Sequence, residues 1–175
     1  VPPEAQAKAR RDLAGYYAHC AALDDCIGEL RATLEAAGVA ENTLIVFTSD
    51  HGDMLASQNA YRKQRPYEES ARVPMLFRVP AALGIKPGRV EATINTEDVM
   101  PTVLRLCGVP VPKTVEGFDF TGAMRGGADP SGGAAIITCV SPFGEYARAT
   151  GGREFRALRS KAYTYVRDLK GPWLL

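Results

Sequence analysis

The chain has 175 residues, 46% of them hydrophobic, and a formal net charge of +1. This length suffices for one domain with a sizeable core, and the balance excludes a disordered or strongly polyionic chain. Basic residues are not gathered on one element, which argues against nucleic-acid binding, and no apolar run of about 18 residues predicts a membrane span. The four cysteines form no CxxC pair, so they indicate neither a zinc ribbon nor a redox motif and leave the compartment open.

The first predicted element is a long amphipathic helix over residues 4–37. Pro2 and Pro3 suit its start, and Gly38 suits its end. His19 lies on this helix without ligand-type residues at the spacing of helical metal pairs, so we interpret it as structural. Apolar residues recur at steps of three and four and form one stripe: Leu13, Tyr16, Tyr17, Cys20, Leu23, Ile27, Leu30 and Leu34.

A strand and a polar loop follow this helix. The apolar run over residues 44–47 predicts a buried strand, which breaks into Asp50-His51-Gly52-Asp53. In an open α/β sheet, ligands bind beyond the carboxyl ends of the strands, so Asp50 and His51 are expected at that edge. A carboxylate beside an imidazole offers one oxygen and one nitrogen ligand to a divalent cation. The alternative is that Asp50 caps a turn and His51 is a solvated loop residue.

Spaced residues beyond His51 extend this motif. They are, in order, Lys63, Tyr67-Glu68-Glu69-Ser70, Arg72-Val73-Pro74 and a second apolar strand over residues 75–79. This order resembles the type I sulfatases of the alkaline phosphatase superfamily, whose pattern runs strand, Ser-Asp-His/Asn-Gly, a loop with one lysine, Tyr-Glu, Arg-x-Pro, strand. The resemblance covers most of the chain, from Tyr16 to Trp173. It departs at the lysine, since relatives often carry a tryptophan before it and a glycine after it, whereas this loop reads Arg62-Lys63-Gln64-Arg65 and is more basic.

The resemblance implies roles for three residues. Asp50 and His51 match the pair that closes the metal site in that family, and Lys63 matches the lysine that contacts sulfate or phosphate oxygens. An ammonium group suits an anion whose charge must be held during displacement, although an ordinary surface lysine is the alternative. Calcium is the ion that a sulfatase implies, whereas manganese or zinc would suit a phosphonate or phosphodiester hydrolase. Tyr67, Glu68 and Arg72 are interpreted as structural.

The family's nucleophile has no counterpart in this sequence. In sulfatases it is a formylglycine made from the first residue of a Cys/Ser-x-Pro/Ala-x-Arg motif, which none of the cysteines fits: Cys20, Cys26, Cys107 and Cys139. We therefore expect the formylglycine and two further acidic metal ligands in an N-terminal part that precedes this chain. The chain is interpreted as the C-terminal part of a larger hydrolase, inactive alone and prone to form homo-oligomers through exposed apolar surface.

The remaining elements complete the predicted fold class, which is α/β. Residues 1–125 are expected to form a partial alkaline-phosphatase-like sheet with flanking helices, and residues 126–175 the start of a small C-terminal antiparallel β subdomain. Asp98 and Thr102 are interpreted as capping groups. The expected elements are a loop at 81–88, a short helix at 101–106, an irregular connection at 109–133 and strands at 134–140, 155–159 and 162–166, the last two as a hairpin.

These features predict a parent protein that uses a metal ion to hydrolyse a sulfate ester of an anionic small molecule. A phosphonate monoester or phosphodiester hydrolase of the same superfamily is the alternative. A non-catalytic binding module would lack metal affinity at Asp50 and His51. A phosphotransferase related to phosphoglycerate mutase would need further histidine and aspartate ligands downstream, yet no histidine follows His51.

Overall fold

The computed structural model describes residues 2–174, which fall into two compact units. The first unit runs to Lys63 and resumes over Tyr67–Pro80, and the second takes Gln64–Pro66 and continues from Ala81. No helix among the described residues is both long and apolar enough to cross a bilayer. The boundary expected between residues 125 and 126 stays a prediction.

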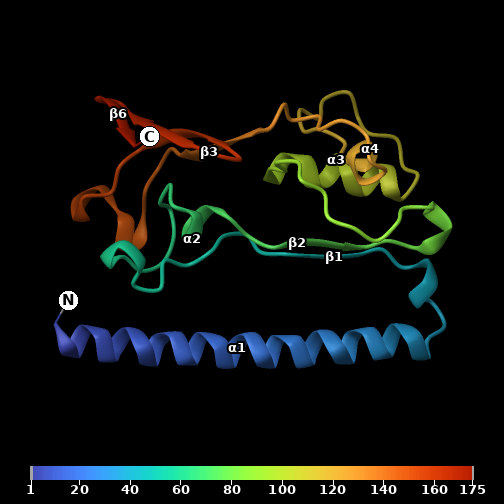
Figure 1. Cartoon of the computed structure of the whole chain (residues 1–175), viewed down its shortest axis with the longest axis horizontal. Helices are drawn as coiled ribbons and strands as arrows, with labels where there is room; N and C mark the ends of the chain where they lie inside the picture. Colours follow the sequence, from blue (N-terminus) through green and yellow to red (C-terminus); the bar gives the residue numbers. More distant parts are fainter. Residues whose placement is uncertain (1, 175) are drawn as a thin grey trace. The chain divides into compact units, whose positions relative to one another are not determined.

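The first unit consists of a long helix and a pair of strands. Helix α1 (Pro3–Ala36) has 34 residues and begins with proline, as predicted. It lies alongside strands β1 (Ile45–Thr48) and β2 (Met75–Arg78), which pair antiparallel (Figure 1). The register sets Thr48, the last residue of β1, opposite Met75, the first residue of β2. Consequently the segments that leave β1 and enter β2 lie at the same end of the pair.

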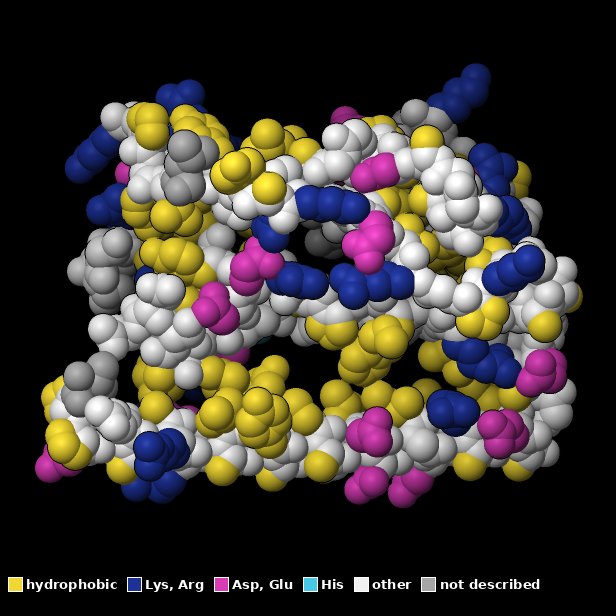
Figure 2. Space-filling view, viewed as in Figure 1, with side chains coloured by type: hydrophobic (Ala, Val, Ile, Leu, Met, Phe, Trp, Pro, Cys, Tyr) yellow, Lys and Arg dark blue, Asp and Glu magenta, His cyan; other side chains and the backbone are white. Residues whose placement is uncertain are grey.

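The apolar stripe of α1 is exposed. No described residue of α1 is buried, and Leu23 and Leu30 are 53% and 56% exposed. Figure 2 shows apolar side chains along much of this helix. Phe47 of β1 and Leu76 of β2 are also exposed. Apolar surface of this kind is typical of a face that another element or another chain covers, and the expected homo-oligomer stays a prediction.

Helix α3 (Thr96–Leu106) in the second unit corrects the predicted start at Pro101. The sequence carries a capping box that we did not predict: the Asn95 side chain accepts the N–H of Thr96 at 3.0 Å, and Asp98 accepts the N–H of Asn95 at 2.8 Å. Pro101 therefore lies inside the helix, where it cannot donate the usual backbone hydrogen bond.

Asp98 and Thr102 also tie this helix to the chain that follows it. Asp98 is a cap, as predicted, and it also accepts the N–H of Phe118 at 2.7 Å. Thr102 is not a cap, because it lies inside α3, where its hydroxyl donates to the Asp98 carbonyl at 2.7 Å and accepts the N–H of Phe120 at 3.1 Å. Both side chains are buried, so their polar groups need these partners.

The C-terminal antiparallel sheet is confirmed. Its strands pair in the order β3, β4, β5, β6, and a backbone hydrogen bond of 2.8 Å from Ser160 to Tyr163 closes the predicted hairpin. Alternate side chains point to one face and form the core: Cys139, Phe155, Ala157 and Val166, with Ile137, Trp173 and Leu174 packed against them. The strands are β3 (Ala134–Cys139), β4 (Phe155–Ser160), β5 (Thr164–Asp168) and β6 (Gly171–Leu174).

Short helices connect these elements. The α-helices are α2 (Glu68–Ala71) and α4 (Thr121–Met124). The 3-10 helices are η1 (Ala40–Asn42), η2 (Ser57–Asn59), η3 (Ala81–Leu83), η4 (Gly144–Tyr146) and η5 (Arg148–Thr150). Most of the predicted irregular region at 109–133 indeed lacks regular structure, apart from α4.

Replacing Asp98 with alanine should destabilise the fold measurably. The change removes the acceptor of two backbone N–H groups, those of Asn95 and Phe118. Because an unsatisfied buried donor costs about 1–3 kcal/mol, we expect Asp98→Ala to lower the free energy of unfolding by about 2–4 kcal/mol. Asp98→Asn keeps one acceptor oxygen and should lose less. Urea unfolding followed by circular dichroism measures both, and equal stability of the alanine variant and the wild type would contradict this network.

Candidate metal and anion site

Because β1 pairs with β2, the segment that follows β1 lies next to the segment that precedes β2. The backbone N–H of Gly52, four residues beyond β1, donates to the carbonyl of Ser70 in α2 at 2.9 Å. A Cβ added at Gly52 would overlap the carbonyl oxygen of Glu69 and lie 2.9 Å from its carbon. Glycine is therefore required at position 52 because the backbone of α2 passes so close.

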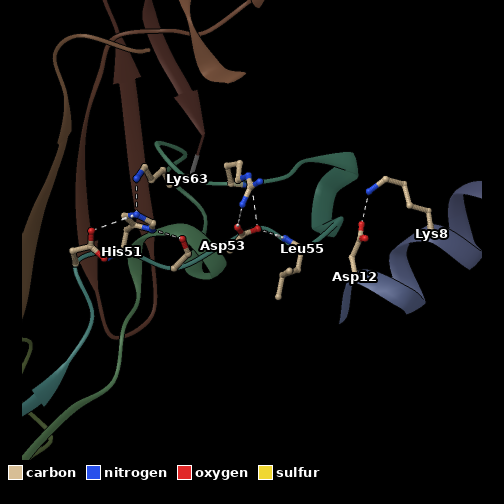
Figure 3. Close-up of polar contacts among 9 residues, drawn as sticks. Lys8, Asp12, His51, Asp53, Leu55 and Lys63 are labelled. Atoms are coloured by element: carbon tan, nitrogen blue, oxygen red, sulfur yellow. Dashed lines mark hydrogen bonds and ion pairs between the residues drawn. The ribbon is translucent and has the colours of Figure 1, made fainter. Parts of the chain in front are cut away.

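The imidazole of His51 is held from two sides. Its Nδ1 lies 2.7 Å from the carbonyl oxygen of Gly52, and its Nε2 lies 2.7 Å from Nζ of Lys63 (Figure 3). A carbonyl only accepts and an ammonium group only donates, so we assign the ring proton to Nδ1 and the lone pair to Nε2. A histidine whose other N–H bonds a backbone carbonyl is oriented in the way that metal-binding histidines are.

Asp50 lies beside the same ring nitrogen. Its Oδ2 is 3.5 Å from Nε2 of His51, and its Oδ1 accepts the backbone N–H of His51 at 3.0 Å. Two ligand atoms about 2.1–2.3 Å from one ion lie about 3.1 Å apart at a right angle and about 3.6 Å apart at a tetrahedral angle. The Asp50 side chain is 84% exposed, so its second oxygen is open to a ligand. The donor set and its spacing fit one divalent cation.

These two side chains are two candidate ligands rather than a full coordination shell. Within residues 2–174, no group of three or more His, Cys, Asp or Glu side chains is arranged to hold a metal ion. The structure thus brings together all three predicted site residues, Asp50, His51 and Lys63, with the lysine on the ring nitrogen that a cation would use.

The two arginines that flank Lys63 are engaged in local contacts. Nη1 of Arg62 lies 3.9 Å from Oδ2 of Asp53 in the first unit. Arg65 lies over the ring of Tyr146 in the second unit, 4.3 Å from its centroid, and burial raises the pKa of that phenol. A cation over an aromatic face is a stabilising contact. Arg62 and Arg65 therefore both have structural roles, in addition to any effect of their charge on the site.

The residues that we interpreted as structural have structural contacts. The carbonyl of Tyr67 accepts the N–H groups of Ser70 and Ala71, both at 3.0 Å, and so begins α2. Nη1 of Arg72 lies 3.5 Å from Oε2 of Glu68 one turn away. These contacts shape the segment that receives Gly52, without reaching the predicted site residues.

Sequence reasoning missed the part played by Asp53. Its carboxylate accepts the backbone N–H groups of Leu55 and Arg62, at 2.9 and 3.0 Å, and thereby closes the loop that ends at Lys63 (Figure 3). An aspartate two residues before a turn is a known signal for this kind of bond to the backbone. That signal predicts the bond to residue 55, but not the distant one to residue 62.

This arrangement defines a class of protein with an α/β unit, a candidate cation site beyond the end of a strand and an antiparallel C-terminal sheet. The family model described as sulfatase matches residues 2–109, and the model described as N-sulphoglucosamine sulphohydrolase, C-terminal, matches residues 57–167. The chain belongs to the sulfatase family.

Individual relatives agree with this assignment. The chain is 38% identical to an ulvan-active sulfatase of Formosa agariphila, over 98% of this chain and 34% of that protein. A phosphonate monoester hydrolase of Agrobacterium radiobacter superposes with a TM-score of 0.76 at 25% identity, over 91% of this chain and 33% of that one. A protein solved with D-glucosamine-2-N,6-O-disulfate gives a TM-score of 0.69 at 29% identity, over 85% and 30%. The chain thus spans about a third of the length of these relatives.

Replacing Gly52 with alanine should disrupt this site. The new methyl group overlaps the backbone of Glu69, so α2 must shift away from the loop. We expect a loss of about 1–3 kcal/mol in the free energy of unfolding, as for an overpacked position. Gly15→Ala in α1 is the matched control, since a Cβ there meets nothing within 4 Å. Urea unfolding should show the control unchanged or stabilised, and equal behaviour of the two variants would contradict the close approach.

Proposed function

We propose that the parent protein of this chain is a metal-dependent hydrolase of sulfate esters. The observation that carries the proposal is the convergence of Asp50, His51 and Lys63: two ligand atoms 3.5 Å apart, with the lysine Nζ 2.7 Å from one of them. Membership of the sulfatase family supports it. The names of two similar proteins, one active on ulvan and one solved with a disulfated glucosamine, support a sulfated sugar as the substrate.

Asp50 and His51 are proposed to supply half of the protein ligands of the metal ion. A bound divalent cation polarises ester oxygens and positions a nucleophile. The carboxylate of Asp50 is exposed on this edge, and the bond from Nδ1 of His51 to the Gly52 carbonyl orients the ring so that Nε2 is the ligand nitrogen. Calcium is proposed for a sulfatase, although a nitrogen ligand also suits manganese or zinc.

Lys63 is proposed to hold the anion. A cation on Nε2 of His51 and the ammonium group of Lys63 compete for the same lone pair, because Lys63 now lies 2.7 Å from that nitrogen. A cation held by Nε2 would leave the ammonium group of Lys63 beside it. There its three donors can bond the oxygens of the transferring group and stabilise their charge.

The nucleophile is proposed to lie outside this chain. No cysteine here has the sequence context of a formylglycine precursor, and the described residues offer two of the metal ligands rather than a full set. We therefore propose that residues preceding this chain in the parent protein supply the formylglycine and the other ligands, and that this chain alone has no hydrolase activity.

A phosphonate monoester hydrolase is the second candidate. The structural likeness to the Agrobacterium radiobacter enzyme favours it, as does the nitrogen ligand of His51. Comparing kcat/KM of the parent protein for an aryl sulfate and for an aryl phosphonate monoester separates the two. The proposal of a sulfatase predicts a higher value for the sulfate, and the reverse order would replace it with the second candidate.

Variants of the parent protein test the proposed roles. Lys63→Ala should lower kcat/KM for an aryl sulfate by about 10²–10³, the usual loss when one charge-stabilising donor is removed. The control Lys86→Ala removes an exposed lysine of the second unit and should leave kcat/KM unchanged. His51→Ala should reduce the bound metal measured by elemental analysis. Full activity of Lys63→Ala, or steady turnover by this chain alone, would contradict the proposal.

A further inference from the structure

Lys63 lies at the end of a loop with an unusual backbone. Among residues 2–174, six residues other than glycine have positive φ, all within the ten positions from 55 to 64: Leu55, Ala56, Gln58, Asn59, Arg62 and Gln64. Two of them flank the lysine directly, Arg62 with a φ of 63° and Gln64 with a φ of 68°. This left-handed region is unfavourable for residues with a Cβ, so the surrounding contacts must hold it in place.

Asp53 makes the contacts that hold the residue before the lysine. Its Oδ1 accepts the N–H of Arg62 at 3.0 Å and the N–H of Leu55 at 2.9 Å. A backbone hydrogen bond of 2.8 Å from the N–H of Met54 to the carbonyl of Arg62 runs beside them. Arg62 is thus held at both its N–H and its carbonyl. Met54, whose N–H bonds that carbonyl, is only 1% exposed and is anchored in the interior.

We propose that Asp53 is a positioning residue for Lys63. By fixing the left-handed backbone of Arg62, its carboxylate determines the direction in which the next side chain leaves the loop. That direction carries Nζ of Lys63 to Nε2 of His51 (Figure 3). The Asp53 side chain is 20% exposed and bonds the backbone N–H groups of Leu55 and Arg62, so it acts on the lysine through the backbone. The positioning of Lys63 does not depend on the proposed function. Only the role of the positioned lysine in holding an anion rests on it.

The contact between Lys63 and His51 can be observed directly in this chain. The sequence contains two histidines, so ¹⁵N spectra of the imidazoles show one ring at the site and one, His19, on the exposed helix α1. Lys63→Met removes the donor to Nε2 and should move the His51 Nε2 signal while leaving that of His19 in place. This variant defines the shift that marks loss of the contact.

Asp53 variants then test the positioning role. Asp53→Ala should move the His51 Nε2 signal in the same direction as Lys63→Met, with loss of the contact, although position 63 still carries lysine. Asp53→Asn keeps an acceptor oxygen for both N–H groups and should retain the wild-type signal. Asp119→Ala is the matched control. Asp119 accepts the N–H of Thr121 at 2.9 Å and lies 3.2 Å from Nε of Arg105. The control therefore removes a similar carboxylate, which bonds a turn and an arginine, from the second unit.

The outcomes separate positioning from general stability. If Asp53 positions Lys63, Asp119→Ala leaves the His51 signal unchanged. Asp53→Ala then shifts the His51 signal, while its His19 signal and its backbone amide spectrum remain native. A His51 signal that stays at its wild-type position in Asp53→Ala, while Lys63→Met moves it, would overturn the proposal. If Asp53→Ala loses its native amide spectrum, Asp53→Asn decides, and a shifted His51 signal in that folded variant also overturns it. None of these results depends on sulfatase activity, so failure here and failure of the proposed function are distinguishable.

Discussion

The hydrogen bond from Nδ1 of His51 to the carbonyl of Gly52 determines what the rest of the site can do. It assigns the ring proton to Nδ1 and leaves the lone pair of Nε2 for a positive group. The carbonyl is itself held, because the N–H of Gly52 donates to Ser70 and the backbone of Glu69 leaves no room for a side chain. The tautomer of one imidazole therefore depends on the way α2 approaches the end of β1.

In the proposed site, Lys63 and a cation are alternatives at this nitrogen. In the described structure, Nζ of Lys63 lies on Nε2 while the carboxylate of Asp50 remains largely exposed. An ammonium group and a divalent ion are both attracted to a lone pair next to a carboxylate. The positive charge of Lys63 therefore offsets the negative charge of Asp50 beside the His51 ring. Under the proposed positioning role of Asp53, the left-handed backbone of the loop helps to place the lysine at that point.

Much of this arrangement could be predicted from the sequence. Helix α1, both strands of the first unit and the C-terminal hairpin follow from periodicity and composition. The resemblance to sulfatases singled out the three residues that the structure brings together, and their roles stay predictions. Proline favours the first turn of a helix and so predicts a start at Pro101, whereas the capping box of Asn95 and Asp98 begins α3 earlier.

The remaining features depend on contacts that one sequence does not show. The bond between Asp53 and Arg62 joins residues nine positions apart. The positive φ values occur at residue types that give no local sign of them, such as Leu55 and Ala56. The need for glycine at position 52 arises from the backbone of Glu69, which reaches it only after β1 and β2 have paired. Tertiary packing, rather than local preference, sets each of these features.

Manganese is a direct probe of the proposed cation site at Asp50 and His51. Paramagnetic Mn²⁺ added to this chain should selectively broaden the imidazole proton signals of His51, while those of His19 remain sharp. In Asp50→Ala the broadening of His51 should be reduced at the same Mn²⁺ concentration, because one of the two ligand atoms is lost. Equal broadening of both histidines, or none at either, would contradict the account.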